Sequence, residues 1–169
     1  MNRKSVTMLM AAWVALTMTG LASIQAFADS RDRSFGYYGW GPRVGVAVDP
    51  DQFVIGGHID MGEAIAHLRL QPNLELGFGE DVTNIEINAP LHFRFSEPID
   101  VWSPYAGLEL GYSIAFVEDA KDNADLGVKV VGGFERHLGD GNKFFLEGKL
   151  GLSDETADWK FLVGWTFVQ

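Results

Sequence analysis

The sequence predicts an all-β protein, built as a single eight-stranded antiparallel up-and-down transmembrane β-barrel. Apolar and polar residues alternate with a period of two along eight stretches of the chain, as expected when successive side chains point to opposite faces of a strand. Clusters of Asp, Asn, Gly and Pro separate these stretches and indicate turns. Helical spacing of apolar residues does not compete with this pattern over any useful window.

The eight predicted strands are similar in length and follow one another along most of the chain. The stretch LRLQPNLELGFG (68–79) shows the pattern, with leucines at even positions and Arg69, Asn73 and Glu75 between them. Pro72 cannot donate a ladder hydrogen bond, so we expect a bulge or a local gap in pairing there. The predicted strands are 43–49, 53–61, 67–78, 84–95, 105–116, 126–137, 144–152 and 158–168.

The start of the chain has the layout of an export signal. Arg3 and Lys4 precede an apolar stretch at 8–22, and Ala26-Phe27-Ala28 matches an A-x-A cleavage pattern. The apolar stretch is short for a membrane-spanning helix. The predicted organisation is a cleaved signal peptide at 1–28, an N-terminal segment at 29–41 and a barrel domain at 42–169.

Composition excludes several classes of protein. The chain has 169 residues and no cysteine, so a disulfide scaffold is excluded. Its net charge of −10 argues against nucleic acid as a partner. No second segment is long and apolar enough for a membrane-spanning helix, which excludes a multi-helix membrane protein.

Alternation alone does not decide which face meets water, because a soluble barrel of the lipocalin kind buries the apolar face. A membrane barrel inverts that arrangement. Here most strand glycines share the polar face, where a narrow interior would need small residues beside its charges. Basic and acidic residues are nearly balanced on the same face, as a buried ion-pair network requires.

Large aromatic residues supply a third indication, because membrane barrels carry aromatic girdles at both interfaces. One end of the predicted barrel would collect Trp40, Phe93, Phe95, Trp102, Tyr105, Phe134, Phe144 and Phe167. The other end would collect Phe53, Phe78, Phe116 and Trp159.

The apolar face is therefore predicted to meet lipid, with the polar face enclosing a packed lumen. A barrel in hydrocarbon must be closed, because an open sheet edge cannot satisfy its backbone groups there. The predicted polar network of the lumen comprises Arg43, His58, Asp60, Arg69, Glu75, Glu86, Arg94, Glu109, Lys129, Glu135, Glu147, Lys149 and Lys160.

The export signal, the eight alternating strands, LRLQPNLELGFG, WSPYAGLELGYS and the aromatic last strand resemble the small bacterial outer-membrane β-barrel family. That family includes the transmembrane domain of outer-membrane protein A and the opacity-type barrels. The resemblance implies location in the outer membrane of a Gram-negative bacterium, insertion by the barrel-assembly machinery, contact with outer-membrane lipids and lipopolysaccharide, and a monomer. Family members usually end in phenylalanine, whereas this chain ends Phe167-Val168-Gln169.

In that topology the first, third, fifth and seventh connections are extracellular and strongly acidic. Their carboxylates could bridge divalent cations to lipopolysaccharide phosphates. The simpler interpretation, which we favour, is a set of solvated loops, since no EF-hand spacing is present. This predicted acidic rim comprises Asp49, Asp51, Glu80, Asp81, Glu118, Asp119, Asp122, Asp125, Asp154, Glu155 and Asp158, against Lys121 alone.

No catalytic, cofactor or metal site is predicted. The four histidines, His58, His67, His92 and His137, lack metal-ligand spacing, and lumen hydrogen bonding explains them better. A lipid A deacylase would need Ser, His and an acid together, but Ser113 and Ser153 are isolated and G-x-S-x-G is absent. We therefore expect a structural or surface-interacting role. A soluble periplasmic barrel binding a hydrophobic ligand, a lipid A-modifying enzyme and a narrow ion path remain as alternatives.

Overall fold

The computed structural model describes residues 35–65, 67–80, 82–117, 123–153 and 159–169, whose regular elements are all β-strands. No helix in these ranges is long and apolar enough to cross a membrane. The strands are β1 (Gly39–Val48), β2 (Gln52–Asp60), β3 (Glu63–Ile65), β4 (Leu68–Leu70), β5 (Asn73–Phe78), β6 (Val82–Arg94), β7 (Trp102–Val117), β8 (Asn123–His137), β9 (Lys143–Gly151) and β10 (Trp159–Val168).

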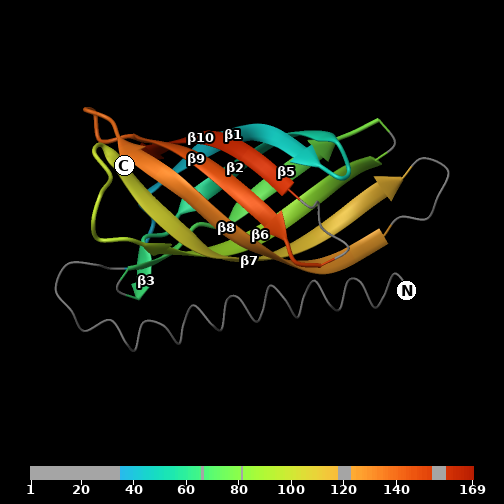
Figure 1. Ribbon diagram of the computed structural model, residues 1–169, viewed down its shortest axis with the longest axis horizontal. Helices are drawn as coiled ribbons and strands as arrows, with labels where there is room; N and C mark the ends of the chain where they lie inside the picture. Colours follow the sequence, from blue (N-terminus) through green and yellow to red (C-terminus); the bar gives the residue numbers. More distant parts are fainter. Residues whose placement is uncertain (1–34, 66, 81, 118–122, 154–158) are drawn as a thin grey trace.

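The ten segments form a closed barrel of eight antiparallel strands, as the sequence predicts (Figure 1). β2 pairs with β5 and β3 pairs with β4, so β2–β3 and β4–β5 each count as one interrupted strand of the barrel. β4 and β5 in turn both pair with β6. Pairing of β1 with β10, from Gly39 opposite Val168 to Val48 opposite Trp159, closes the barrel.

The interruption between β4 and β5 confirms the gap expected at Pro72. β4 ends at Leu70 and β5 begins at Asn73. The ring of Pro72 removes the amide hydrogen, although its carbonyl still accepts a hydrogen bond of 2.9 Å from the Ile59 amide. The strand therefore loses one rung of its ladder without leaving the barrel wall.

The two ends of the barrel differ in their connections. β1 begins and β10 ends at one end, called the terminal end here, where the C-terminus lies in Figure 1. The strand ends that lead into the β1–β2, β5–β6, β7–β8 and β9–β10 connections lie at the other end, called the loop end. β1 starts at Gly39, so Trp40 and Gly41, which the sequence assigned to the N-terminal segment, belong to the barrel wall.

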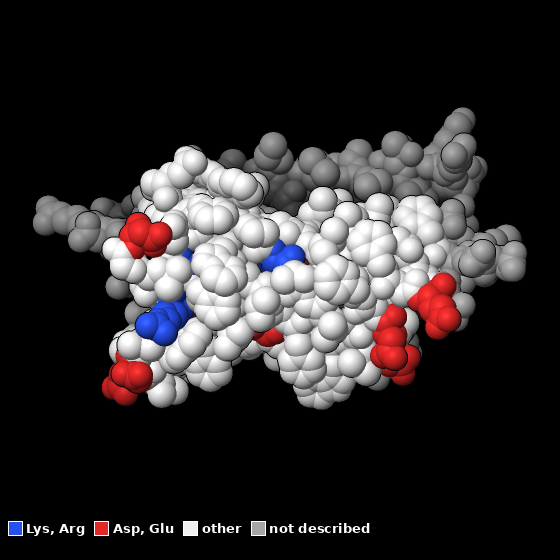
Figure 2. Space-filling model, turned by 90° about the horizontal axis from the view of Figure 1, so that it is seen from above, with Lys and Arg blue, Asp and Glu red and all other residues white. Residues whose placement is uncertain are grey.

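The apolar face of the strands points outward. Leu74 and Ile87 are 47% and 39% exposed, whereas their neighbours Glu75 and Glu86 are 1% and 2% exposed. Figure 2 shows the result on one side of the molecule, where uncharged residues cover most of the barrel and acidic residues gather towards its ends. This arrangement is the reverse of that in a soluble barrel.

Aromatic residues gather on the outer surface of the terminal end. The rings of Trp40 and Phe167 lie 5.6 Å apart, and those of Phe144 and Trp165 lie 4.6 Å apart. One residue assigned to this girdle from the sequence was placed wrongly: Tyr105 is 4% exposed and lies inside the barrel. It occupies an odd position, like Glu109 on the same strand, so the alternation turns it inward.

Candidate functional site: the charged interior of the barrel

The interior of the barrel is a set of buried ionic side chains supplied by alternate residues of the strands. Because each strand places every second residue inward, distant parts of the sequence deliver their charges to the same enclosed space. The predicted lumen residues are all buried apart from Arg94, whose side chain is half-buried.

Four carboxylates and four cations form a central cluster in the middle of this space. Glu75 lies at its centre, accepting hydrogen bonds from Lys149 at 2.6 Å, from Arg43 at 3.1 Å and from Lys160 at 3.3 Å. The central cluster comprises Arg43, Lys129, Lys149 and Lys160 with Glu75, Glu86, Glu109 and Glu147, and its formal charge is zero.

The remaining contacts tie the central cluster to most of the wall. Lys160 of β10 reaches Glu86 of β6 at 2.7 Å, and Lys129 of β8 also donates to Glu86. Lys149 of β9 reaches both oxygens of Glu109 on β7, at 2.8 and 3.0 Å. The cluster therefore links strands that are not neighbours in the sheet. Each buried charge has an opposite charge within reach, as its removal from water requires.

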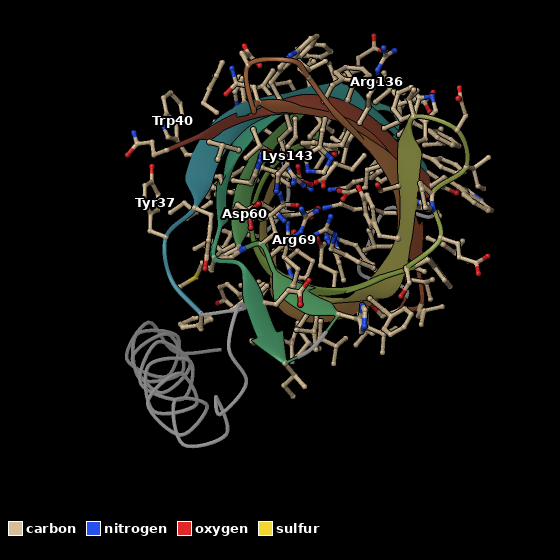
Figure 3. All side chains as sticks on the ribbon, turned by 90° about the vertical axis from the view of Figure 1, so that its left-hand side faces the viewer. Tyr37, Trp40, Asp60, Arg69, Arg136 and Lys143 are labelled. Carbon is tan, nitrogen blue, oxygen red and sulfur yellow. The ribbon has the colours of Figure 1, made fainter. Side chains whose placement is uncertain are left out.

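A second ionic group, the terminal-end cluster, lies nearer the terminal end. Arg69 donates to Glu135 at 2.5 Å and lies 3.6 Å from Asp60, which accepts a hydrogen bond of 2.9 Å from Lys143. In Figure 3 Asp60, Arg69 and Lys143 point into the barrel from different strands. The terminal-end cluster comprises Asp60, Glu63 and Glu135 with Arg69, Arg94 and Lys143, and it too is formally neutral.

The rings of Tyr105 and Phe145 lie between the clusters. The Tyr105 hydroxyl donates to Glu147 at 2.9 Å, and the ring lies 5.9 Å from the Arg69 guanidinium carbon. Phe145 is 1% exposed and its ring centroid lies 5.2 Å from the Arg43 guanidinium carbon. These rings occupy interior space between the ionic groups and hold the cationic side chains on their faces.

Sequence reasoning left several interior residues out of the predicted network. Lys143 lies one position before the predicted strand 144–152, yet it has the same parity as Glu147 and belongs to β9. The odd position of Tyr105 in β7 would likewise have identified it as an interior residue. Further buried polar residues are Gln52, Gln71, Asn73, Asn84, Asn88, His92 and Thr166. Of these, Gln71 and Asn73 were expected to point inward from the alternation, and His92 was expected to lie in the lumen. His58, which was predicted, hydrogen-bonds Thr166 at 2.8 Å.

The predicted acidic rim is only partly within the described residues. Asp49, Asp51 and Glu80 are exposed at the loop end. Asp125 lies in β8 opposite Ser113, not in the connection to which the sequence assigned it. The other predicted rim residues, Asp81, Glu118, Asp119, Asp122, Asp154, Glu155 and Asp158, lie outside the described residues, as does the predicted signal peptide.

Ser113 and His137, a serine and a histidine that a deacylase could use, are far apart. Ser113 pairs with Asp125 on β8, whereas His137 ends the same strand twelve positions later, about 40 Å away at 3.3 Å per residue. Over the described parts of the chain, no three His, Cys, Asp or Glu residues form a group that could hold a metal ion.

Comparison with solved structures finds the same architecture in other proteins. Neisserial surface protein A superposes with a TM-score of 0.62 and 14% identity, over 80% of this chain and 98% of that one. The N-terminal β-barrel domain of Pseudomonas aeruginosa OprF gives 0.58 and 16%, over 80% and 98%. The Yersinia pestis outer membrane protein Ail gives 0.51 and 9%, over 78% and 99%.

The chain has the fold of the small outer-membrane β-barrels. No protein-family model matches it, and no curated protein matches it in sequence. At identities of 9–16%, the likeness to these barrels rests on the strand number, the pairing and the closure of the sheet, not on shared side chains.

Proposed function

We propose that the chain is an integral outer-membrane protein of a Gram-negative bacterium with a structural or surface-interacting role and no catalytic activity. The observation that supports this most directly is the inverted distribution of side chains, with large apolar residues outside and ionic residues inside. A continuous apolar surface of this extent is unfavourable in water but matches the hydrocarbon of a bilayer. The proposed partners are outer-membrane lipids, lipopolysaccharide and the assembly machinery that inserts the barrel.

A soluble barrel that binds a hydrophobic ligand is the alternative from another class. Such a barrel needs an apolar cavity, whereas the described interior is mostly ionic. Its one apolar cluster joins the small or medium side chains of Ala47, Val54 and Leu162. These three side chains account for too little of the lining to enclose a hydrophobic ligand. The interior therefore favours the membrane barrel over the soluble one.

We also propose that the lumen is closed to free diffusion. Eight strands enclose a space that side chains can fill, and here long cations and the rings of Tyr105 and Phe145 cross it. In planar lipid bilayers the protein should give no steady single-channel conductance. Long-lived open levels at low voltage would contradict a closed lumen without affecting the proposed membrane location.

Cell fractionation tests the proposed location. The mature protein should sediment with the outer membrane, should need detergent for extraction, and should migrate differently on a denaturing gel before and after boiling. Heat-dependent migration is expected because a closed barrel held by backbone hydrogen bonds resists detergent at room temperature. Recovery of the protein in the aqueous supernatant after high-speed centrifugation would instead support the soluble barrel.

Two leucine substitutions test the orientation of the wall. Leu108 lies within β7 and Leu152 directly follows β9, and they are 57% and 56% exposed. Leu108→Arg should lower the free energy of unfolding in lipid vesicles by about 2–4 kcal/mol, because it places a cation in hydrocarbon. Leu152→Arg should cost about 0–1 kcal/mol, because that site lies near the interface. Equal effects of the two substitutions would argue against a lipid-facing wall.

Lipid A analysis tests the enzymatic alternative. Mass spectra of lipid A from cells with and without the protein should be the same, since Ser113 and His137 cannot meet. A new deacylated or otherwise modified species would overturn the non-catalytic assignment.

A further inference from the structure

One cation interrupts the apolar outer surface formed by the described strand residues. Among the described strand residues that point outward, Arg136 of β8 is the charged one, and it is exposed. Figure 3 shows it outside the wall, on the opposite side of the sheet from Arg69 and Lys143. It has no ion-pair partner within the described parts of the chain. A cation at the edge of hydrocarbon extends towards the interface, where water and lipid phosphates are both within reach.

The neighbours of Arg136 place it at the membrane interface. Its register partners are Trp102 on β7 and Phe144 on β9, and their rings lie 6.1 Å apart. The Phe144 ring also contacts Trp165 of β10. Trp and similar amphipathic rings concentrate at the headgroup level of a bilayer. Arg136 therefore lies at the depth where lipid phosphates are found, at the terminal end of the barrel.

A shallow apolar hollow lies on the outer wall further along β8 and β9, and its lining continues over β10, β1 and β2. It has a volume of about 490 Å³ and includes the outward positions of Gly132, Gly148, Phe134, Leu146 and Phe161. Gly132 pairs with Gly148, so two neighbouring strands both lack a side chain in the β8–β9 part of the hollow. A Cβ atom at either glycine would meet other atoms only at 3.9–4.0 Å. The packing of the barrel itself therefore does not require glycine there.

The spacing between Arg136 and the hollow fits one lipid molecule. Gly132 precedes Arg136 by four residues, about 13 Å along the strand and about 10 Å in depth at a tilt near 40°. With a hydrocarbon core about 30 Å thick, that depth lies within the acyl region of the same leaflet. A phosphate on Arg136 would therefore place an acyl chain over Phe134 and Leu146 and into the hollow.

We propose that Arg136 and the Gly132–Gly148 hollow form a binding site for an anionic phospholipid of the leaflet at the terminal end. This inference rests on the proposed location of the barrel in a membrane. The guanidinium binds the phosphate, and the net negative charge of the headgroup favours it over zwitterionic lipids. The hollow binds the part of one acyl chain that is nearest the headgroup. Lipopolysaccharide is not the proposed occupant, because it belongs to the leaflet at the loop end.

Native mass spectrometry of the detergent-solubilised full-length mature barrel tests the site. After incubation with equimolar phosphatidylglycerol and phosphatidylcholine, the wild type should retain phosphatidylglycerol preferentially. Arg136→Gln should reduce that preference about fivefold, the loss expected for one cation near an anionic surface. Gly132→Val/Gly148→Val should weaken retention of both lipids by filling the hollow.

Gly57→Val is the matched control for the glycine variant. Gly57 also points outward, and a Cβ there would meet only the Gly41 carbonyl, at 3.6 Å. It lines a different outer hollow, on β2 away from Arg136, whose described lining contains no Lys or Arg. This variant should keep the preference of the wild type for phosphatidylglycerol. Equal retention of the two lipids by a wild-type barrel that still shows heat-dependent gel migration would overturn the lipid site alone. In a second incubation, with equimolar phosphatidylglycerol and lipid A, preferential retention of lipid A would overturn the assignment to the leaflet at the terminal end. A barrel absent from membranes would overturn the proposed function itself.

Discussion

Replacing Glu75 with glutamine should destabilise the barrel by about 3–5 kcal/mol, the cost of removing one partner from a buried ionic group. Glu75 contacts Arg43, Lys149 and Lys160, so the substitution leaves three cations around a neutral amide. The central cluster would then carry one uncompensated positive charge out of reach of water. Urea unfolding in phosphatidylcholine vesicles, followed by tryptophan fluorescence, measures the change.

Two further variants distinguish the effect of an uncompensated buried charge from the effect of replacing a glutamate with glutamine. Glu80→Gln makes the same chemical change at an exposed position of the loop end, and its stability should stay close to that of the wild type. Glu75→Gln/Lys149→Met restores neutrality to the central cluster and should recover part of the loss. If Glu75→Gln unfolds at the same urea concentration as Glu80→Gln, the central cluster does not stabilise the barrel.

Gly41→Ala should prevent the barrel from closing. An added Cβ at Gly41 would lie 1.5 Å from the carbonyl oxygen of Trp165 and 2.6 Å from its carbonyl carbon, so β1 and β10 could not keep their register. Because the obstructing atoms are backbone, relief requires movement of a strand, and we expect a cost of about 3 kcal/mol or more. The measurement is the fraction of refolded protein that shows heat-dependent migration on a gel, which should fall to a small part of that of the wild type.

Gly57→Ala is the control that isolates the effect of the close contact between β1 and β10. Gly57 lies on the neighbouring strand, where the added atom would meet nothing closer than 3.6 Å, so folding should be retained. Similar folding of Gly41→Ala and Gly57→Ala would show that the β1–β10 seam tolerates a wider separation than the structure has.

The period of two in the sequence was enough to predict the strands and their faces. Steric constraint makes successive side chains alternate strictly, so Leu74 and Glu75 could be assigned to opposite faces without knowledge of the fold. The gap at Pro72 was also predictable, because the missing amide hydrogen is a property of proline itself. Tyr105 was misplaced because its aromatic character was given more weight than its position.

The sequence could not predict which carboxylate of the interior pairs with which cation. The contact between Glu75 of β5 and Lys160 of β10 depends on how far each strand is shifted along the barrel, and alternation carries no information on that shift. The hollow beside Arg136 was hidden for the same reason, because Gly132 and Gly148 become neighbours only once β8 and β9 are in register. The aromatic neighbours of Arg136 on β7 and β9 also become apparent only from the register of these strands.

The interruption at Pro72 and the ionic interior also bear on how the chain enters a bilayer. Glu75 follows that interruption closely, while its cationic partners come from β1, β9 and β10, so they are supplied by both ends of the polypeptide. In a partly inserted sheet, Glu75 would face acyl chains before its cationic partners on β1, β9 and β10 could pair with it. We therefore expect the strands to insert into the bilayer and the interior ion pairs to form in a single concerted step, when β1 and β10 pair.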